Sequence, residues 1–253
     1  MSNKKFEKWA SGYSGFDGGN PKGKIWLCGI EWGGQNPKKE DLEKLFEEDV
    51  TTVPTGYECH TINMKFQQYN VKFIKVMASL YDIEFIKNNR YDKKSIEEFN
   101  NKEKFFTKDS NYLKLNLLPF NFPNVSEEKW DINYQNLTGF KSKKEYMDWS
   151  LNARFEMFQN LTKEYSPKII ITVGKTHFEN YKNAFGYRDA LFITERFNSN
   201  QNKEYKYFYD KENNRVMFNF PFFSGRYGLN SNNLLIESGK VIKNLLDKNN
   251  IAL

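Results

Sequence analysis

The chain has 253 residues, a length that suits one substantial α/β core, and no linker rich in Pro, Gly or Ser divides it. Its apolar runs are too short to cross a membrane, and its first ten residues lack the apolar stretch of a signal peptide, which predicts a cytoplasmic protein. The net charge of +6 suits a phosphate-rich partner, but only six of the 38 basic residues are arginine, a bias that an AT-rich genome also produces. Charge alone therefore favours nucleic acid only modestly over a small-molecule substrate.

Cysteine and histidine are scarce, which limits the metal sites that the chain can build. Cys28 lies inside an apolar run and Cys59 stands beside His60, so the two cysteines make no disulfide framework. A zinc site would need both cysteines together with His60 and His177, or several carboxylates. We expect no metal, no iron–sulfur cluster and no other cofactor. His177 is predicted to pack at a helix start, and adjacent residues such as Cys59 and His60 rarely face each other as a nucleophile pair must.

Four apolar runs predict the strands of a central sheet, and segments of helical period lie between them. In chain order the expected strands are Ile25–Gly29, Tyr112–Leu118, Ile169–Val173 and Val216–Phe220. The expected helices are Leu42–Glu47, Val71–Tyr81, Lys144–Tyr165, His177–Phe185 and Leu234–Leu246. Because strands that alternate with helices form mostly parallel sheets covered on both faces, the pattern predicts a three-layer α/β/α fold with a mostly parallel four-stranded sheet.

Two regions break this alternation. Residues 82–110 are charged and irregular, which predicts an insertion over the sheet edge. Residues 191–215 contain YKYFYD and then KENN, which predicts an antiparallel hairpin leading into the last strand. Neither region divides the core, so we expect one domain over 1–253 that carries both inserts.

The segment KIWLCGIEWGGQNP, residues 24–37, is the most informative part of the chain. An apolar strand ends there in a turn with Gly29, Gly33 and Gly34, and glycine lets the backbone take positive φ and approach a ligand closely. The turn would present Glu31 at the carboxyl end of a strand, where ligands bind in open α/β sheets. The alternative is an ordinary turn with a solvated glutamate.

Two segments imitate phosphate-binding loops. The run from Gly18 to Lys24 has the right spacing, but Ile25 replaces the Ser or Thr that holds magnesium, and the segment precedes its strand. VGKT at 173–176 follows a strand but lacks the first glycine. NTP hydrolysis is therefore not predicted, although Gly174 and Lys175 form a turn before a helix where an anion could sit.

Four segments taken in order resemble the uracil-DNA glycosylase superfamily in its divergent branches. They are GIEWGG at 29–34, KLNLLPF at 114–120, SPKIIITVGK at 166–175 and NFPFFSGRYGLN at 219–230. The resemblance covers roughly residues 18–245 and implies a monomeric glycosylase that acts on DNA. It implies that Glu31, within a first motif of Gly29, Ile30, Trp32 and Gly33, assists attack on the sugar, and that Asn116 reads the flipped base. The last motif would place Ser224, Gly225 and Arg226 against the DNA.

The chemistry also follows from the residue types. Cleavage of an N-glycosidic bond develops positive charge on the sugar, which a carboxylate such as Glu31 stabilises, and an ionised Glu31 needs no special pKa for this role. Asn116 offers a donor and an acceptor to a base edge, or merely caps its strand. An extruded base needs an aromatic wall, and Trp32 and Tyr57 are the candidates, although loop aromatics more often pack. For Ser224–Arg226 the alternative is a solvated turn before the last helix.

Departures from the family pattern bear on the substrate. Phe220 stands where the family often has histidine before the last proline, Trp32 replaces the proline of the first motif, and the cysteines of the iron–sulfur branches are missing. Some divergent members resemble phage-defence enzymes that remove glucosylated hydroxymethylcytosine, so the resemblance implies a hypermodified pyrimidine in DNA. The alternatives are a uracil or damaged-base repair glycosylase, a catalytically silent nucleic-acid-binding relative, and hydrolysis of a free nucleoside.

Overall fold

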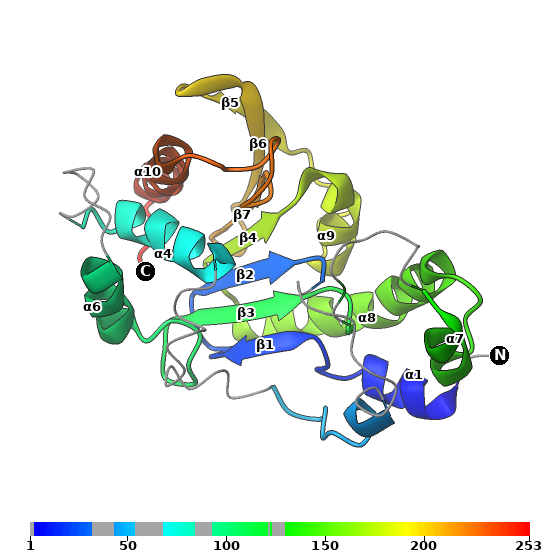
Figure 1. Ribbon diagram of the computed structural model, residues 1–253. Helices are drawn as coiled ribbons and strands as arrows, with labels where there is room; N and C mark the ends of the chain where they lie inside the picture. Colours follow the sequence, from blue (N-terminus) through cyan, green and yellow to red (C-terminus); the bar gives the residue numbers. More distant parts are fainter. Residues whose placement is uncertain (1–2, 32–42, 54–67, 84–92, 121, 123–129) are drawn as a thin grey trace.

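The computed structural model describes residues 3–31, 43–53, 68–83, 93–120, 122 and 130–253, and the statements below concern these residues. One sheet of seven strands runs through them, in the order β1-β3-β2-β4-β7-β6-β5 (Figure 1). The strands are β1 Phe16–Gly19, β2 Ile25–Gly29, β3 Tyr112–Asn116, β4 Ile169–Val173, β5 Ile193–Phe197, β6 Asn200–Asp210 and β7 Arg215–Phe220. The protein is therefore an α/β protein with a mixed sheet.

The expected four-stranded sheet is wrong in size. The four expected segments are present as β3, β2, β4 and β7, and each pairs in parallel with its neighbour. The sheet continues on both sides, because β1 pairs antiparallel with β3 and the β5–β6 hairpin pairs antiparallel with β7. The hairpin expected in 191–215 is confirmed. The sequence of β1, FDGG, has low strand propensity, which explains why it was not predicted.

Helices cover both faces of the sheet (Figure 1). They are α1 Lys4–Ala10, α4 Gln68–Leu80, α6 Lys93–Glu103, α7 Ile132–Thr138, α8 Lys143–Tyr165, α9 Phe178–Ala184 and α10 Asn232–Lys248. Side-chain caps fix where several of them begin: Ser142 accepts from Glu145 N at the start of α8, and Ser231 accepts from Leu234 N at the start of α10. The helix α6 corrects the expectation that 82–110 is irregular.

Alternate residues of β2 enter two separate cores, since successive side chains of a strand point to opposite faces. Ile25 and Leu27 pack with α4 and α10 in what we call the first core. Trp26 and Cys28 pack on the other face with α1, α8 and α9 in the second core, where Cys28 is a free, buried thiol. Both faces of this strand are thus apolar, as its unbroken apolar sequence predicts.

Arg154 of α8 fastens the amino-terminal segment to the second core. Its guanidinium is buried and donates to the carbonyl oxygens of Ala10 at 2.6 Å, Gly12 at 3.2 Å and Ser14 at 2.6 Å. Ser14 Oγ lies 3.1 Å from the same guanidinium. The segment between α1 and β1 therefore depends on a side chain that comes much later in the chain.

Candidate functional site

Polar residues gather where the four parallel strands end. Gly29 of β2 is level with Asn116 of β3, and Val173 of β4 is level with Phe220 of β7, so the four carboxyl ends form one edge. Glu31 follows β2 and Asn116 closes β3, while Asn219 is the second-last residue of β7. This edge is where open α/β sheets bind ligands.

Glu31 is buried and paired rather than solvated. Its side chain is 5% exposed, and its Oε2 lies 3.2 Å from Nζ of Lys143, whose side chain is fully buried. Lys143 is the first residue of α8, and its ammonium also lies 3.8 Å from the centre of the Phe122 ring. The cap at Ser142 fixes where α8 begins, and so places the lysine opposite the carboxylate.

Burial shifts the titration of both partners. It raises the pKa of Glu31 from 4.5 to about 7, although the positive charge of Lys143 acts in the opposite direction. Burial lowers the pKa of Lys143, and the Glu31 carboxylate opposes that change. The pKa of Glu31 is thus not the ordinary one, and at neutral pH only part of the population carries the ionised carboxylate. A carboxyl group with a pKa near 7 exchanges its proton readily at neutral pH, which suits acid–base chemistry.

His177 lies within electrostatic reach of this pair, whereas its sequence context predicts only that it packs at a helix start. It ends the short 3₁₀ turn Lys175–His177 after β4. Burial lowers its pKa, and the positive charge of Lys143 lowers it further, so the imidazole is neutral at pH 7. Its position directly after the glycine turn of an expected strand is the signal that could have identified it.

Gly29 and Asn116 lie against each other at the ends of their strands. A Cβ on Gly29 would come within 2.6 Å of Asn116 Oδ1, so close approach, and not a positive φ, requires glycine here. Asn116 Nδ2 donates to the Gly15 carbonyl at 3.1 Å. This bond is what the strand-capping interpretation predicts, and it leaves only Oδ1 to face Gly29.

Two tyrosines complete the surroundings of Glu31. Tyr181 Oη donates to the Val173 carbonyl at 2.9 Å, and Tyr146 Oη accepts from Phe120 N at 3.1 Å. Burial raises the pKa of both phenols, and the Glu31 carboxylate adds to the effect. Both remain protonated at neutral pH and hold main chain in place around the carboxylate.

The other predicted site residues are not all in this cluster. Ile30 is 8% exposed and belongs to the second core, so it packs. Lys175 is exposed and lies 3.8 Å from Glu204 of β6 in an ion pair. Trp32, Gly33 and Tyr57 lie outside the described residues, as do Gly34, Cys59 and His60.

The loop after β7 presents Ser224, Gly225 and Arg226 on the surface, together with Tyr227, which is 82% exposed. Gly225 has a φ of +78°, which favours glycine. Phe223 and Leu229 anchor the loop in the first core. The tip is thus exposed, as a loop that contacts DNA and the alternative solvated turn both require, and the base of the loop is apolar.

Two lysine side chains donate hydrogen bonds to the main chain of this loop. Lys72 of α4 donates to the Phe223 carbonyl, and Lys203 of β6 donates to the carbonyls of Gly228 and, at 3.1 Å, Arg226. Lys203 Nζ also lies 3.4 Å from Asn230 Oδ1. These bonds fix the main chain of the loop and leave its exposed side chains available to a partner.

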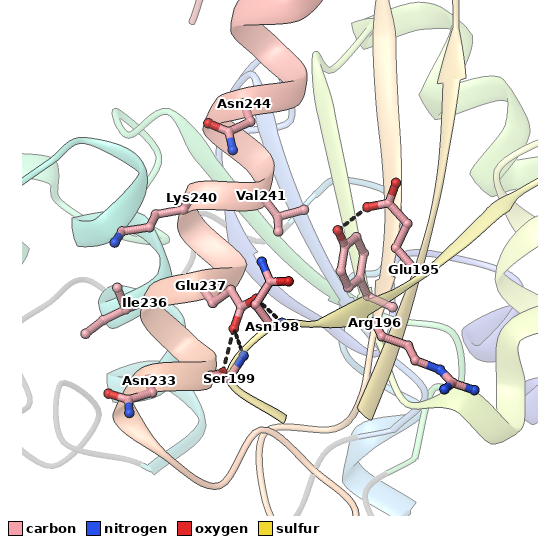
Figure 2. Close-up of a pocket in the computed structure, with 11 residues that line it drawn as sticks. Glu195, Arg196, Asn198, Ser199, Asn233, Ile236, Glu237, Lys240, Val241 and Asn244 are labelled. Atoms are coloured by element: carbon pink, nitrogen blue, oxygen red, sulfur yellow. Dashed lines mark hydrogen bonds between the residues drawn. The ribbon is translucent and has the colours of Figure 1, made fainter. Parts of the chain in front are cut away.

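A separate cavity of about 490 Å³ lies between α10 and the β5–β6 hairpin (Figure 2). Its two carboxylates serve the hairpin: Glu195 accepts from Tyr205 Oη at 2.5 Å, and Glu237 accepts from the amides of Asn198 and Ser199. None of the predicted site residues lines it. We therefore assign the candidate site to the carboxyl edge of the parallel strands.

Within the described part of the chain, no three His, Cys, Asp or Glu side chains gather closely enough to hold a metal ion. No helix of that part is long and apolar enough to span a bilayer. No protein-family model matches the chain, and no curated protein matches its sequence.

Proposed function

We propose that the protein is a DNA glycosylase that extrudes a modified base and hydrolyses its N-glycosidic bond to leave an abasic site. The observation that carries the proposal is the buried Glu31–Lys143 pair at the carboxyl edge of four parallel strands. The order of the four motifs along the chain, and the three-layer arrangement that the resemblance implies, support it further.

In this proposal the ionised form of Glu31 does the chemical work. Its charge stabilises the oxocarbenium character of the sugar and orients or deprotonates the attacking water. Lys143 favours that ionised form against the effect of burial. Neutral His177 supplies an N–H donor for the negative charge on the departing base, a role for which the last motif, with Phe220 before its proline, offers no histidine.

The exposed loop after β7 would contact the DNA. Arg226 offers a charged donor to a phosphate, and the exposed ring of Tyr227, with the Arg226 guanidinium 5.8 Å from its centre, offers a flat surface to a base. The rigid base of the loop, held by Lys72 and Lys203, reduces the entropy that binding would cost.

For the substrate we propose a hypermodified pyrimidine, with glucosylated hydroxymethylcytosine as the leading candidate, and phage defence as the setting. A small closed pocket selects uracil by excluding larger bases, so departures from the motifs favour a wider one. The two inserted regions contain α6 and the β5–β6 hairpin. These are folded elements outside the four segments that carry the resemblance.

The test is base release. The protein is incubated with genomic DNAs that carry different natural modifications, and released bases are identified by mass spectrometry. We expect release of a hypermodified pyrimidine, little action on uracil, and no release by Glu31→Gln. Efficient cleavage of uracil DNA together with inertness toward glucosylated DNA would favour ordinary repair instead.

A catalytically silent nucleic-acid-binding relative is the second candidate, because two observations favour it. The Glu31 carboxylate is only 5% exposed, and Asn116 donates to the main chain of its own protein. Such a relative binds DNA and releases no base from any of the DNAs, so the same experiment, combined with a binding measurement, separates the two.

A further inference from the structure

Asn219 carries a buried hydrogen-bonding group that the fold does not use. It is 1% exposed and lies in β7 opposite Thr172 of β4. Its neighbours Phe218 and Phe220 belong to the first core, so its own side chain points to the opposite face. Tyr181 of α9 lies in the core on that face, and α8, which begins with Lys143, packs there as well.

The amide of Asn219 has one possible orientation. Its Nδ2 donates to Thr172 Oγ1 at 2.9 Å and lies 3.3 Å from the Gly174 carbonyl. Thr172 Oγ1 donates its own proton to the Phe218 carbonyl at 2.9 Å. If the amide flipped, Oδ1 would face two acceptors, so Nδ2 stays toward β4 and Oδ1 stays away from it.

Oδ1 of Asn219 is buried and accepts no hydrogen bond from any described residue. Buried acceptors without a donor destabilise a fold and are rare in native proteins, so each needs an explanation. Both N–H groups of the Asn219 amide make hydrogen bonds, and these bonds hold Oδ1 in place without a donor of its own. A ligand that supplies the missing donor would explain this arrangement.

The position of the amide agrees with this explanation. Asn219 adjoins Gly174, the first residue after β4, and among the described residues a Cβ on Gly174 would come near Tyr181 Oη alone, at 3.9 Å. Tyr181 in turn is close enough to Glu31 for the carboxylate to raise its pKa. The unpaired oxygen is therefore part of the same edge as the proposed catalytic carboxylate.

We propose that Asn219 Oδ1 accepts a hydrogen bond from the exocyclic amino group of an extruded cytosine-type base. The inference rests on the proposed function and narrows its substrate class. At the corresponding position uracil and thymine carry a carbonyl oxygen, which is an acceptor and would face Oδ1 unfavourably. Asn219 thus selects amine-bearing pyrimidines by the fixed direction of one amide.

The first experiment does not depend on catalysis. The side-chain amide signal of Asn219 is assigned by nitrogen–proton NMR from its loss in Asn219→Leu, and 1-methylcytosine or 1-methyluracil is added to the wild-type protein. We expect 1-methylcytosine to shift the signal and 1-methyluracil to need about tenfold more ligand for the same effect. No shift with either, or a cross-peak to a bound water that both leave unchanged, would overturn the inference.

The second experiment measures discrimination in DNA. Thr172→Val removes the nearer of the two acceptors that orient the amide and leaves only the Gly174 carbonyl, so Nδ2 is held less firmly. We expect the preference for a cytosine-type over a uracil-type base to fall, by up to about tenfold. The control is Asn20→Leu, because Asn20 Nδ2 donates to the Ser110 carbonyl at 2.9 Å, remote from the carboxyl edge.

The outcomes separate the two proposals. An unchanged preference in Thr172→Val, with base release intact, would overturn the role of Asn219 and leave the glycosylase proposal standing. Absence of base release from every DNA would overturn the glycosylase proposal, and the NMR titration would still decide whether Asn219 recognises the amine.

Discussion

Lys143 Nζ and Glu31 Oε2 lie 3.2 Å apart, and burial drives the two groups toward their uncharged forms while each favours the charge of the other. The pair is therefore balanced between a charged and a neutral state. Small changes in its surroundings should shift that balance, which makes the pair the most testable feature of the molecule.

Glu31→Gln should abolish base release, because an amide cannot take the ionised form that the proposed reaction requires. Removing either member changes the cost of burying the other, so the effects of Glu31→Gln and Lys143→Met on stability should not add. The double variant removes both charges of this pair and should be at least as stable as either single variant, with no activity. Urea denaturation of the two single variants and the double variant measures this, and strictly additive effects would contradict coupling.

The pH dependence of stability follows from the raised pKa of Glu31. Between its usual value of 4.5 and about 7, the folded state binds a proton that the unfolded state has lost. The stabilisation is complete below about pH 4.5 and is lost as the pH rises through 7, by roughly 3 kcal/mol in total. Wild-type stability relative to Glu31→Gln should fall over this range, and a constant difference would contradict a raised pKa.

In the proposed reaction the ionised carboxylate of Glu31 is the active form, so activity should change with pH in the opposite direction to stability. We expect turnover to rise as the pH passes about 7, where Glu31 loses its proton. In Lys143→Met this rise in turnover should move to higher pH, since the positive charge that favours ionisation of Glu31 is gone. Lys143→Arg should move the rise part of the way back toward its wild-type pH. Single-turnover rates across the pH range measure both shifts, and an unmoved rise in Lys143→Met would contradict the electrostatic role.

Arg226→Ala should weaken DNA binding and make its logarithmic dependence on salt shallower by about one unit, because one phosphate contact is lost. The fold should be unaffected, since the residue is exposed. Arg188→Ala is the control, because it removes an exposed arginine after α9, outside the loop. Equal salt slopes for wild type and Arg226→Ala would exclude a phosphate contact by this arginine.

Lys203→Met should weaken DNA binding indirectly, by releasing the carbonyls of Arg226 and Gly228 that it holds. Lys206→Met removes the same charge from the same strand, but Lys206 donates to a side chain, Thr194 Oγ1 at 2.9 Å, away from the loop. Fluorescence anisotropy should show a clearly larger loss of affinity for Lys203→Met. Equal losses would mean that charge, and not the position of the loop, determines affinity.

The sequence predicts the centre of this fold well because β2 and β4 are almost wholly apolar and β3 and β7 are mostly apolar, as is typical of strands buried on both faces. Local sequence cannot show that Lys143 is buried, because a lysine at a helix start is ordinarily solvated and its partner Glu31 is distant in sequence. Local sequence also cannot show that the Asn219 amide is held in one direction, because this depends on the pairing of its strand with Thr172.

The anchoring of the amino-terminal segment by Arg154 has a consequence for biosynthesis. The segment between α1 and β1 finds its buried donor only after the first half of α8 has left the ribosome, and among the described strands β1 pairs with β3, nearly a hundred residues later. Until then Phe6 and Trp9, which are buried in the finished protein, have no core to enter. Long-range contacts of this kind fold slowly, so the first part of the nascent chain is a natural client for chaperones that bind exposed apolar segments.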